Sequence, residues 1–453
     1  MSAAPPFYIV PLTHPTWDRA LACARGLPPE ALAELRLDLF HEEDPEAMVT
    51  ALGRRCLVTC RRADEGGAWR GDEAARLERL LAGARSRPAW VGLEWDLPVP
   101  PELAECLPHV RLLRMMHAAG GEFDLEARLG DLPRGDAFEW VGRAATLADN
   151  ARLRAPLAWA RDRNLALSAF LLGPKGIPGR CMQAAWGGAF TYAHADDSPT
   201  VEPGQIALGR MLGWRCHKLH AGYALCGVLG HPVLHSLGPG FHNPRFQRSF
   251  KDLLYLPLEC HDAPEAEAAL EALGILGASL TTPLKETLPP RLGLAGPLNT
   301  LCRRRTTDPW IGGNTDFTAL DAALEGLEAG PVLVLGDGGV AETTRQVLAR
   351  RGWPGLCHSR RAPLEPGAAR AFAPKGVVQA TRQGMDPGDP MPFPQVVAET
   401  EGSARWAVEW IYKEDTAFAA WAREGGRHLV TGATLFAAQA EGQSAAFIRE
   451  CGG

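Results

Sequence analysis

The stretch Val332-Leu-Val-Leu335-Gly336-Asp-Gly-Gly339-Val-Ala341 joins an apolar run to a glycine-rich turn. The apolar run predicts a fully buried strand, and Glu342 to Arg351 has the pattern of a helix. Glycines let the backbone approach a pyrophosphate, and the N-terminus of the following helix supplies amide donors. The stretch therefore predicts a doubly wound α/β domain that binds a dinucleotide, although Ala341 stands where the generic motif has its third glycine.

The next predicted strand indicates which dinucleotide binds. Leu356-Cys-His-Ser359-Arg360-Arg361 ends in two guanidinium groups and has no acidic residue. A carboxylate there would bond a free ribose 2′-hydroxyl, whereas arginine is suited to a 2′-phosphate. NADP is therefore favoured over NAD, and a solvated basic loop is the alternative interpretation. The residues expected to bind the cofactor are Gly336, Asp337, Gly338, Gly339, Val340, Ala341, Ser359, Arg360, Arg361, Thr381 and Gly432.

Two phrases upstream of the glycine-rich turn carry ionisable side chains. They are Ser279-Leu-Thr-Thr-Pro-Leu-Lys285-Glu286 and Gly312-Gly-Asn-Thr-Asp316. A lysine and an aspartate ahead of a dinucleotide-type turn suit proton transfer at a carbon that exchanges hydride with a nicotinamide. Taken alone, Lys285 would be interpreted as a surface lysine after a helix-starting proline.

From about Leu225 to the end, the chain resembles the shikimate dehydrogenase family. The matching phrases, in the order of the family, are Gly230–Pro239 with His242–Asn243, Ser279–Glu286, Leu298–Thr300, Asn314–Asp316, Ala380–Thr381 with Gly384–Met385, Tyr412–Thr416 and Gly432–Gln439. The resemblance implies NADP-dependent reduction of 3-dehydroshikimate to shikimate, a step of aromatic amino acid biosynthesis. It also implies that Lys285 and Asp316 are catalytic and pass a proton to the carbonyl oxygen.

The same resemblance implies a substrate pocket formed by Ser236, Gly238, Ser279, Thr281, Asn299, Tyr412 and Gln439. Two of these positions depart from the family. Gly238 replaces the second serine of the carboxylate loop, and Ser279 replaces an asparagine. Because each change removes or shortens a hydrogen-bonding group, a quinate/shikimate dehydrogenase of shifted specificity is an alternative.

The first half of the chain alternates apolar runs with helical segments such as Asp72 to Arg85 and Leu147 to Arg161. Repeated strand–helix units over about 200 residues predict a (β/α)8 TIM barrel. The predicted strands are Phe7–Leu12, Ala33–Leu39, Cys56–Cys60, Trp90–Trp95, Val110–Met116, Trp140–Ala144 and Leu165–Leu171.

This half, roughly Phe7 to Arg215, resembles the type I 3-dehydroquinate dehydratase family. The matching phrases are Glu34–Asp38, Thr59–Arg61 with Glu65–Gly67, Leu93–Glu94, Met116–His117, Gly173–Gly176 with Arg180, and Pro203–Gln205. The resemblance implies a dehydratase-like site made of Glu34, Arg36, Arg61, Glu94, His117, Arg180 and Gln205.

One position of the barrel departs from its family in a way that affects chemistry. Type I dehydratases form a Schiff base through a strand lysine in the phrase Val-Lys-x-Ala, and the aligned phrase is Val141-Gly142-Arg143-Ala144. Glycine has no amine, and arginine stays protonated. The only lysines of this half are Lys175 and Lys218, and Val201 stands at the family's substrate-loop serine. We expect a barrel that has lost dehydration but still binds 3-dehydroquinate; a bifunctional dehydratase/dehydrogenase is the alternative.

The predicted organisation is a barrel over residues 1–220, a substrate-binding domain over 225–327 and 430–453, and a Rossmann NADP-binding domain over 328–429. The segment 216–227 is interpreted as the last helix of the barrel running into a linker. With 453 residues, the chain is too long for one core.

Composition limits the partners and the compartment. A net charge of −6 gives no reason to expect nucleic-acid or membrane binding, and no apolar run reaches the ~18 residues of a membrane span. The N-terminus lacks the features of a signal peptide. The eleven cysteines lie singly without a Cys-x-x-Cys motif, which predicts reduced thiols, no metal site and a cytoplasmic protein.

Small-molecule ring acids are the expected partners, and the oligomeric state is open. A non-catalytic ligand-binding or regulatory protein is the alternative of another class. The presence of Lys285, Asp316 and Asn299 argues against it.

Overall fold

The computed structural model describes residues 6–53, 55–117, 125, 129, 130, 132–198, 200, 202–386, 388–413 and 415–452. Val201, expected in the barrel's substrate loop, lies outside these residues. The chain divides into two compact units, Met1–Ile275 and Leu276–Gly453, and each is described by itself. Among the helices of the described residues, none has the length and apolarity that a membrane crossing requires.

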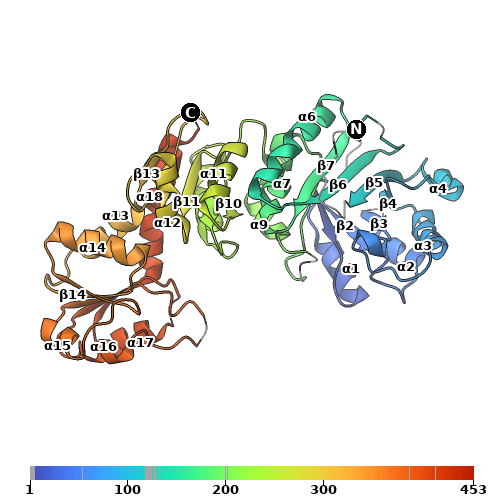
Figure 1. The fold of residues 1–453 in the computed structure, drawn as a ribbon. Coiled ribbons are helices and arrows are strands. Elements are labelled where there is room, and N and C mark those ends of the chain that lie inside the picture. Colours follow the sequence, from blue (N-terminus) through green and yellow to red (C-terminus); the bar gives the residue numbers. More distant parts are fainter. Residues whose placement is uncertain are drawn as a thin grey trace. The chain divides into compact units, whose positions relative to one another are not determined.

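Eight parallel strands form a nearly closed barrel in the first unit (Figure 1). In sheet order the strands are β7, β6, β5, β4, β3, β2, β1 and β8. The amide of Ala189, just before β8, donates to the carbonyl of Leu167 in β7 at 2.8 Å, which links the two ends of this order. The strand bounds are β1 (Tyr8–Pro11), β2 (Ala31–Arg36), β3 (Cys56–Thr59), β4 (Trp90–Glu94), β5 (Arg111–His117), β6 (Ala137–Arg143), β7 (Ala166–Leu172) and β8 (Thr191–Tyr192).

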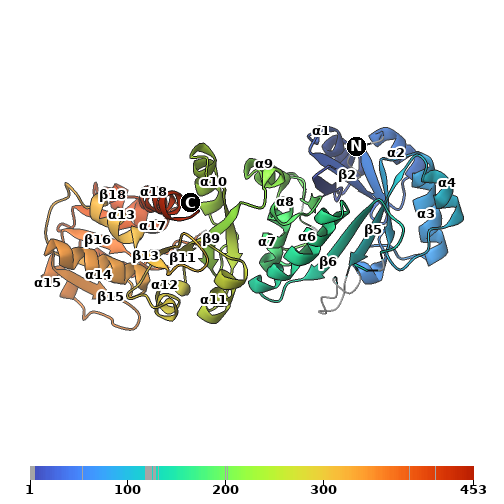
Figure 2. The same cartoon turned by 90° about the horizontal axis from the view of Figure 1, so that it is seen from above.

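Helices lie along the outside of these strands (Figure 2). Asp44 and Asp72 cap α2 and α3 by accepting from the amides of Ala47 and Ala75, which explains where these helices begin. The helices are α1 (Trp17–Gly26), α2 (Pro45–Leu52), α3 (Glu73–Arg85), α4 (Pro101–Cys106), α6 (Arg154–Asp162), α7 (Ile177–Cys181), α8 (Gln183–Trp186) and α9 (Leu208–Gly213). Single 3₁₀ helices are η1 (Ala63–Glu65), η2 (Leu147–Leu153), η3 (Pro174–Gly176) and η4 (Cys216–Lys218).

Alternation along the strands separates two apolar cores. Ile9, Leu113, Val141 and Phe170 belong to the cluster that fills the barrel interior. A second cluster, with Leu35 among its members, packs between the strands and the surrounding helices. Each predicted strand of the barrel overlaps an observed one, which confirms the barrel.

The interpretation of segment 216–227 as the last barrel helix is wrong. The last α-helix, α9, ends at Gly213, and Arg215 has a φ of 57°, a left-handed conformation that stops a helix. Only the short 3₁₀ helix η4 follows, and the next strand already begins at Ala224.

The rest of the first unit is one parallel strand pair with two helices. β9 (Ala224–Gly230) pairs along its length with β10 (Leu253–Glu259). Helix α10 (Gly238–Arg248) lies between them in the chain, and α11 (Ala263–Ala272) follows β10. The predicted helix from Ala263 to Leu273 is confirmed to within one residue.

The second unit begins with a small antiparallel arrangement. β11 (Gly277–Leu280) pairs with β12 (Thr300–Cys302), which pairs with β13 (Ile311–Gly313). The chain between β11 and β12 forms α12 (Leu284–Thr287) and η5 (Pro289–Leu292). Helix α13 (Thr315–Ala323) follows β13 directly, because Asn314 caps its first turn by accepting from the amide of Phe317.

The remainder of the second unit is the predicted doubly wound domain. Its parallel sheet has the order β15-β14-β16-β17-β18. Helix α14 covers one face, whereas α15, α16 and α17 cover the other (Figure 1). The bounds are β14 (Val332–Leu335), α14 (Gly339–Arg351), β15 (Gly355–His358), α15 (Ala368–Phe372), β16 (Gly376–Gln379), α16 (Pro394–Ala398), β17 (Trp406–Glu409), α17 (Ala417–Glu424), β18 (His428–Val430) and α18 (Gly432–Glu450).

Candidate functional site

Lys285 and Asp316 form a close ion pair in the second unit. Nζ of Lys285, on α12, lies 2.5 Å from Oδ2 of Asp316, in the first turn of α13. The Asp316 side chain is 8% exposed and that of Lys285 is 22% exposed, so the amine faces solvent on one side. The N-terminus of α13 also favours the carboxylate, because its free amides carry partial positive charge. The pair can therefore hold a proton and pass it to a bound oxygen.

Asn299 fixes the turn that carries Asp316. Its amide oxygen accepts from the backbone amide of Thr315 and from the hydroxyl of Thr300, both at 2.8 Å, and its amide nitrogen donates to the Thr315 hydroxyl at 3.0 Å. The Thr315 hydroxyl also lies 3.4 Å from Oε1 of Gln439 on α18. Asn299 and Gln439, both predicted site residues, are thus brought together next to Asp316.

Ser279, a predicted substrate-pocket residue, is hydrogen-bonded within the protein. Its hydroxyl donates to Oε1 of Gln443 at 2.9 Å, and Nε2 of Gln443 donates to the backbone carbonyl of Asn299 at 3.0 Å. Ser279 therefore supports the position of Asn299 through Gln443, which no sequence motif singled out. Thr281, at the end of β11, accepts from the amide of Leu284 through its backbone carbonyl and so shapes the turn before Lys285.

The glycine-rich turn lies directly beside Lys285. A Cβ at Gly339 would lie 3.1 Å from Oε1 of Glu286 and 4.0 Å from Cδ of Lys285. Gly336 has a φ of 122°, and a Cβ there would lie 2.8 Å from the carbonyl oxygen of Ala380, so the chain needs glycine at this position. The strand–turn–helix is therefore held close to Thr381 on one side and to the Lys285 phrase on the other.

The start of α14 is suited to an anion. Gly338 is its N-cap, so no side chain caps the first amides, and a Cβ at Gly338 would meet none of the described residues within 4 Å. These amides, which include those of Gly339, Val340 and Ala341, are free to bind a pyrophosphate. Asp337 lies in the same turn and faces Nε of Arg361 at 3.9 Å.

The two arginines after β15 lie in a tight exposed turn. Ser359 accepts through its hydroxyl from the amides of Arg361 and Ala362 at 3.2 and 3.0 Å. Arg360 and Arg361 are exposed, so their guanidinium groups are available to a ligand phosphate.

Gly432 and Tyr412 are brought together at the start of α18. A Cβ at Gly432 would lie 2.2 Å from the carbonyl oxygen of Ile411, so only glycine allows this approach. The Tyr412 ring lies 6.2 Å from that of Phe436, and partial burial raises the pKa of its hydroxyl.

The predicted carboxylate loop lies in the first unit. The Ser236 hydroxyl accepts from the amide of Gly238 at 3.1 Å. A Cβ at Gly238 would lie 2.9 Å from Cε1 and 3.3 Å from the hydroxyl of Tyr255, so this tyrosine takes the space of a serine side chain. Asn243 holds the backbone of Tyr255 through two hydrogen bonds of 2.7 and 2.9 Å. Tyr255 therefore places a hydroxyl where the second family serine is missing, a feature that sequence matching did not reveal.

A buried acid–base cluster lies at one end of the barrel strands. Nδ1 of His117 lies 3.1 Å from Oε2 of Glu65, and its Nε2 lies 3.8 Å from Oε1 of Glu139. Tyr192 donates to Oε2 of Glu139 at 2.9 Å. Burial, with Arg61 and Arg36 nearby, holds the pKa of His117 well below its usual value, so its ring is neutral. Sequence motifs include Glu65 only within the phrase Glu65–Gly67, and they do not select Glu139 or Tyr192 as candidate site residues.

Burial raises the pKa of Glu139 to about 7. Its partners Tyr192 and Arg61 lower the pKa, but not enough to offset the loss of solvent. The carboxyl is therefore partly protonated near neutral pH and can donate as well as accept a hydrogen bond.

The remaining predicted barrel residues are paired or buried. Arg61 lies 4.0 Å from Glu34, and Thr59 donates to the same carboxylate at 2.8 Å. Arg36 makes a bidentate pair with Asp38 at 2.9 and 2.6 Å. Arg180 pairs with Glu202 at 2.8 Å, and Gln205 is buried.

Glu94 differs from the other predicted barrel residues. Both of its oxygens pair with Arg76 of α3, at 2.9 and 3.0 Å. The described contacts thus assign Glu94 to a buried ion pair with an outer helix, whereas Glu65 is the carboxylate that contacts His117.

The register of β6 shows which of its residues face the cluster. Val141 pairs with His117 and belongs to the interior core, as expected for alternation with Glu139. A Cβ at Gly142 would instead lie 2.3 Å from the Trp140 ring and 3.1 Å from Leu171. Neither Val141 nor Gly142 carries an amine.

The two lysines of this half lie elsewhere. Lys175, in η3, has its Nζ 2.5 Å from Glu265 on α11, and Lys218 lies in η4. Neither lysine lies on a barrel strand.

Comparison with known proteins identifies both halves. The model of the type I 3-dehydroquinase family matches residues 8–213, and that of the shikimate dehydrogenase substrate binding domain matches residues 228–295. The chain is 34% identical to a shikimate dehydrogenase (NADP(+)) of Anaeromyxobacter sp. strain Fw109-5 over 252 residues, 48% of this chain and 88% of that protein.

Two further relatives match the barrel and the fusion. A 3-dehydroquinate dehydratase of Dehalococcoides mccartyi strain BAV1 is 30% identical over 188 residues, 40% of this chain and 83% of the relative. The shikimate biosynthesis protein AroDE of Chlamydia pneumoniae is 24% identical over 362 residues, which cover 76% of this chain and 74% of that protein. The similarity to AroDE extends over more of the chain than either half alone.

The buried Glu139 makes the stability of the barrel depend on pH. Its folded pKa of about 7 lies above the ordinary 4.5, so the folded state binds more protons between these values. The free energy of unfolding should therefore fall as pH rises from 5 to 8, by roughly 3 kcal/mol from this group. Glu139→Gln should remove that part of the fall, as measured by urea unfolding at both pH values.

Tyr192→Phe is the matched control, because it removes the partner and keeps the carboxyl. It should retain the fall with pH. An equal fall in the native chain and in Glu139→Gln would contradict the assignment.

Proposed function

Because the chain belongs to the shikimate dehydrogenase family over its C-terminal part and to the type I 3-dehydroquinate dehydratase family over its barrel, we propose that it reduces 3-dehydroshikimate to shikimate with NADPH. The observation that carries the proposal is the Lys285–Asp316 ion pair next to the glycine-rich turn at Gly339. The relative from Anaeromyxobacter is named as NADP(+)-dependent, which supports the same cofactor here.

The residues of the second unit fit NADP. The uncapped N-terminus of α14 would hold the pyrophosphate, and Arg360 and Arg361, exposed after β15, would hold the 2′-phosphate. When bound, NADPH supplies a hydride to the carbonyl carbon of the substrate. Thr381 and Gly432 come from the loops after β16 and β18, at the carboxyl ends of the sheet strands where such ligands bind.

Lys285 and Asp316 supply the proton that the reduction also requires. The Lys285 ammonium would donate a hydrogen bond to the substrate carbonyl oxygen, which stabilises the negative charge that develops there. Asp316 holds the ammonium in place at 2.5 Å. Asn299 and Thr315 hold Asp316 through the first turn of α13, so the pair is fixed before the substrate binds.

For the barrel we propose ligand binding without dehydration. The family route needs an amine that forms a Schiff base with the substrate ketone. The inward residues of β6 include Ala137, Glu139 and Val141, and none of these three carries an amine. The neutral His117 with Glu65, and the arginines Arg61 and Arg180, would still bind a ring acid such as 3-dehydroquinate. Relatives of the barrel are named as dehydratases, so a bifunctional enzyme is the competing proposal.

Lys285→Ala and Asp316→Ala should each lower the turnover of NADPH with 3-dehydroshikimate by about 10²–10⁴-fold. NADPH binding, followed by its fluorescence, should stay nearly unchanged because neither group contacts the phosphates. Lys375→Ala is the control, since it removes a lysine that pairs with Glu328 at 2.8 Å in the same unit. Near-normal turnover in either site variant would exclude that residue from the mechanism.

Arg360→Asp should weaken the binding of NADPH far more than that of NADH, because it places a negative charge against the 2′-phosphate. Binding of both cofactors can be measured by fluorescence titration. Arg370→Asp, an exposed change on α15, should affect neither. An equal loss for both cofactors in Arg360→Asp would show that Arg360 does not contact the 2′-phosphate.

Borohydride treatment of the chain with 3-dehydroquinate should leave no covalent adduct. Val141→Lys places an amine at the inward position beside His117 and should gain an adduct, detected by mass spectrometry. Gly142→Lys should not, because its side chain would be directed at Trp140. A reduced adduct on Lys175 or Lys218 of the native chain would mean that the dehydratase chemistry uses another lysine, and the barrel would then be an active enzyme.

A further inference from the structure

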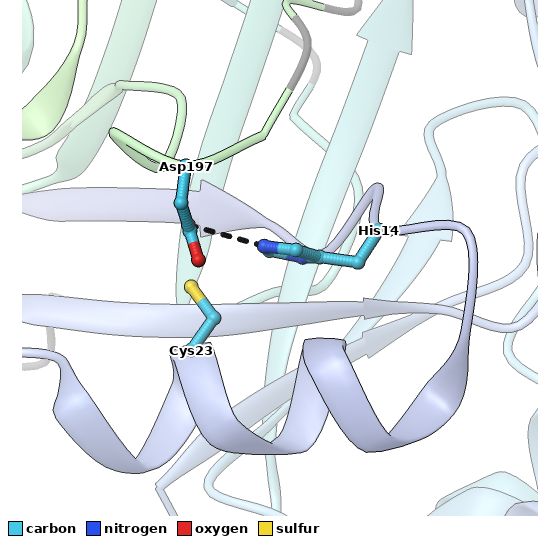
Figure 3. Close-up of side chains that lie close together, drawn as sticks. All are labelled: His14, Cys23 and Asp197. Carbon is cyan, nitrogen blue, oxygen red and sulfur yellow. Dashed lines mark hydrogen bonds and ion pairs between the residues drawn. The ribbon is translucent and has the colours of Figure 1, made fainter.

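Three side chains that are far apart in the sequence converge at the rim of the barrel. His14 lies in the loop after β1, Cys23 lies on α1, and Asp197 lies in the loop after β8. One nitrogen, one sulfur and one oxygen atom of these residues all lie within 4.8 Å of one another. Figure 3 shows the three side chains pointing toward a common centre, with Nε2 of His14 3.1 Å from Oδ1 of Asp197. We propose that His14, Cys23 and Asp197 bind one divalent cation of the zinc type.

The ligand set suits this class of cation. Imidazole nitrogen, thiolate sulfur and carboxylate oxygen are the three protein ligands that Zn²⁺ binds, and an open site keeps a fourth position for water. Hard cations such as Mg²⁺ and Ca²⁺ prefer oxygen alone. The Asp197 side chain is 70% exposed and Cys23 is partly buried, whereas His14 is buried, so an ion can enter from the solvent side.

The charges around the site favour a cation. Asp196 and Asp197 are adjacent on the loop after β8, and Asp197 supplies one of the three ligand atoms. The negative charges of these carboxylates attract a divalent cation.

Burial fixes the orientation of the His14 ring. Its side chain is 2% exposed, and Nε2 lies 3.1 Å from Oδ1 of Asp197. Nε2 is therefore the nitrogen that would bind the ion together with Asp197.

A second group supplies an internal comparison. His231, Glu259 and His261, at the ends of β9 and β10, also place their ligand atoms within 4.8 Å of one another. Both histidines are exposed, and their rings are tilted by 42° with centroids 4.1 Å apart. Glu259 already accepts from His231 and from the amide of Val233. This group has no thiolate, so a spectroscopic signal from sulfur distinguishes the two.

Cobalt titration of the full chain, first dialysed against a chelator, tests the site directly. Co²⁺ should bind with one equivalent, release the Cys23 proton and show a thiolate-to-cobalt charge-transfer band. Zn²⁺ should then displace Co²⁺ and remove the band without further proton release. Cys23→Ser should abolish the band and weaken zinc binding by at least about 10-fold, measured by calorimetry. Asp197→Asn, at an exposed position, should also weaken it, whereas His261→Ala should not.

The proposal is overturned if the native chain shows no thiolate band with Co²⁺. It is equally overturned if zinc binding survives Cys23→Ser unchanged or is lost in His261→Ala. Unfolding midpoints of each variant without metal, compared with the native chain, separate loss of a ligand from loss of the fold. A fall in zinc affinity in Asp197→Asn with an unchanged midpoint supports the site.

Discussion

The contact between Lys285 and Asp316 is the constraint around which the second unit is arranged. The two residues are 31 positions apart in the chain, yet their charged atoms lie at 2.5 Å. The short distance depends on how the backbone around Asp316 is held. Asn299 holds the first turn of α13 through the amide of Thr315, and Gln443 on α18 holds the backbone carbonyl of Asn299. The glycines of the nucleotide turn then let α14 approach the lysine without a side chain between them. The ion pair, the residues that hold the first turn of α13 and the glycines of the turn therefore all position the same small region around Lys285.

The barrel, in contrast, contains acid–base groups but has no lysine on its strands. Its interior keeps a neutral histidine, several carboxylates and arginines, all held by short hydrogen bonds. These groups can bind a polar ring and move protons, but a Schiff base needs an amine at the reacting carbon. A carboxyl at Glu139 with a raised pKa cannot supply one, because it can donate a proton without forming a covalent electron sink. In our account, therefore, the two halves of the chain share a pathway but not the ability to catalyse.

Much of the fold could be predicted from the sequence because periodicity and turn chemistry are local. The strand at Val332, the glycine turn and the helix cap at Asp72 all follow from a few adjacent residues. Asn299, Gln439 and Asp316 could be predicted as site residues because ordered phrases resemble a family, and the structure brings the three together. Contacts between distant segments could not be predicted. Glu94, expected in the barrel site, pairs with Arg76 on an outer helix, and no local pattern indicates this partner. Glu139, Tyr255 and the His14–Cys23–Asp197 group become visible only when the strands and loops are placed in space.

One coupled assay tests the central claim, that the chain has a working dehydrogenase and a barrel without dehydration. NADPH oxidation by the purified full chain is followed with 3-dehydroshikimate and, separately, with 3-dehydroquinate. The account predicts rapid oxidation with the first substrate and none above background with the second, because the barrel would not supply 3-dehydroshikimate. Oxidation with 3-dehydroquinate would contradict the account of the barrel, and no oxidation with 3-dehydroshikimate would contradict the proposed function itself.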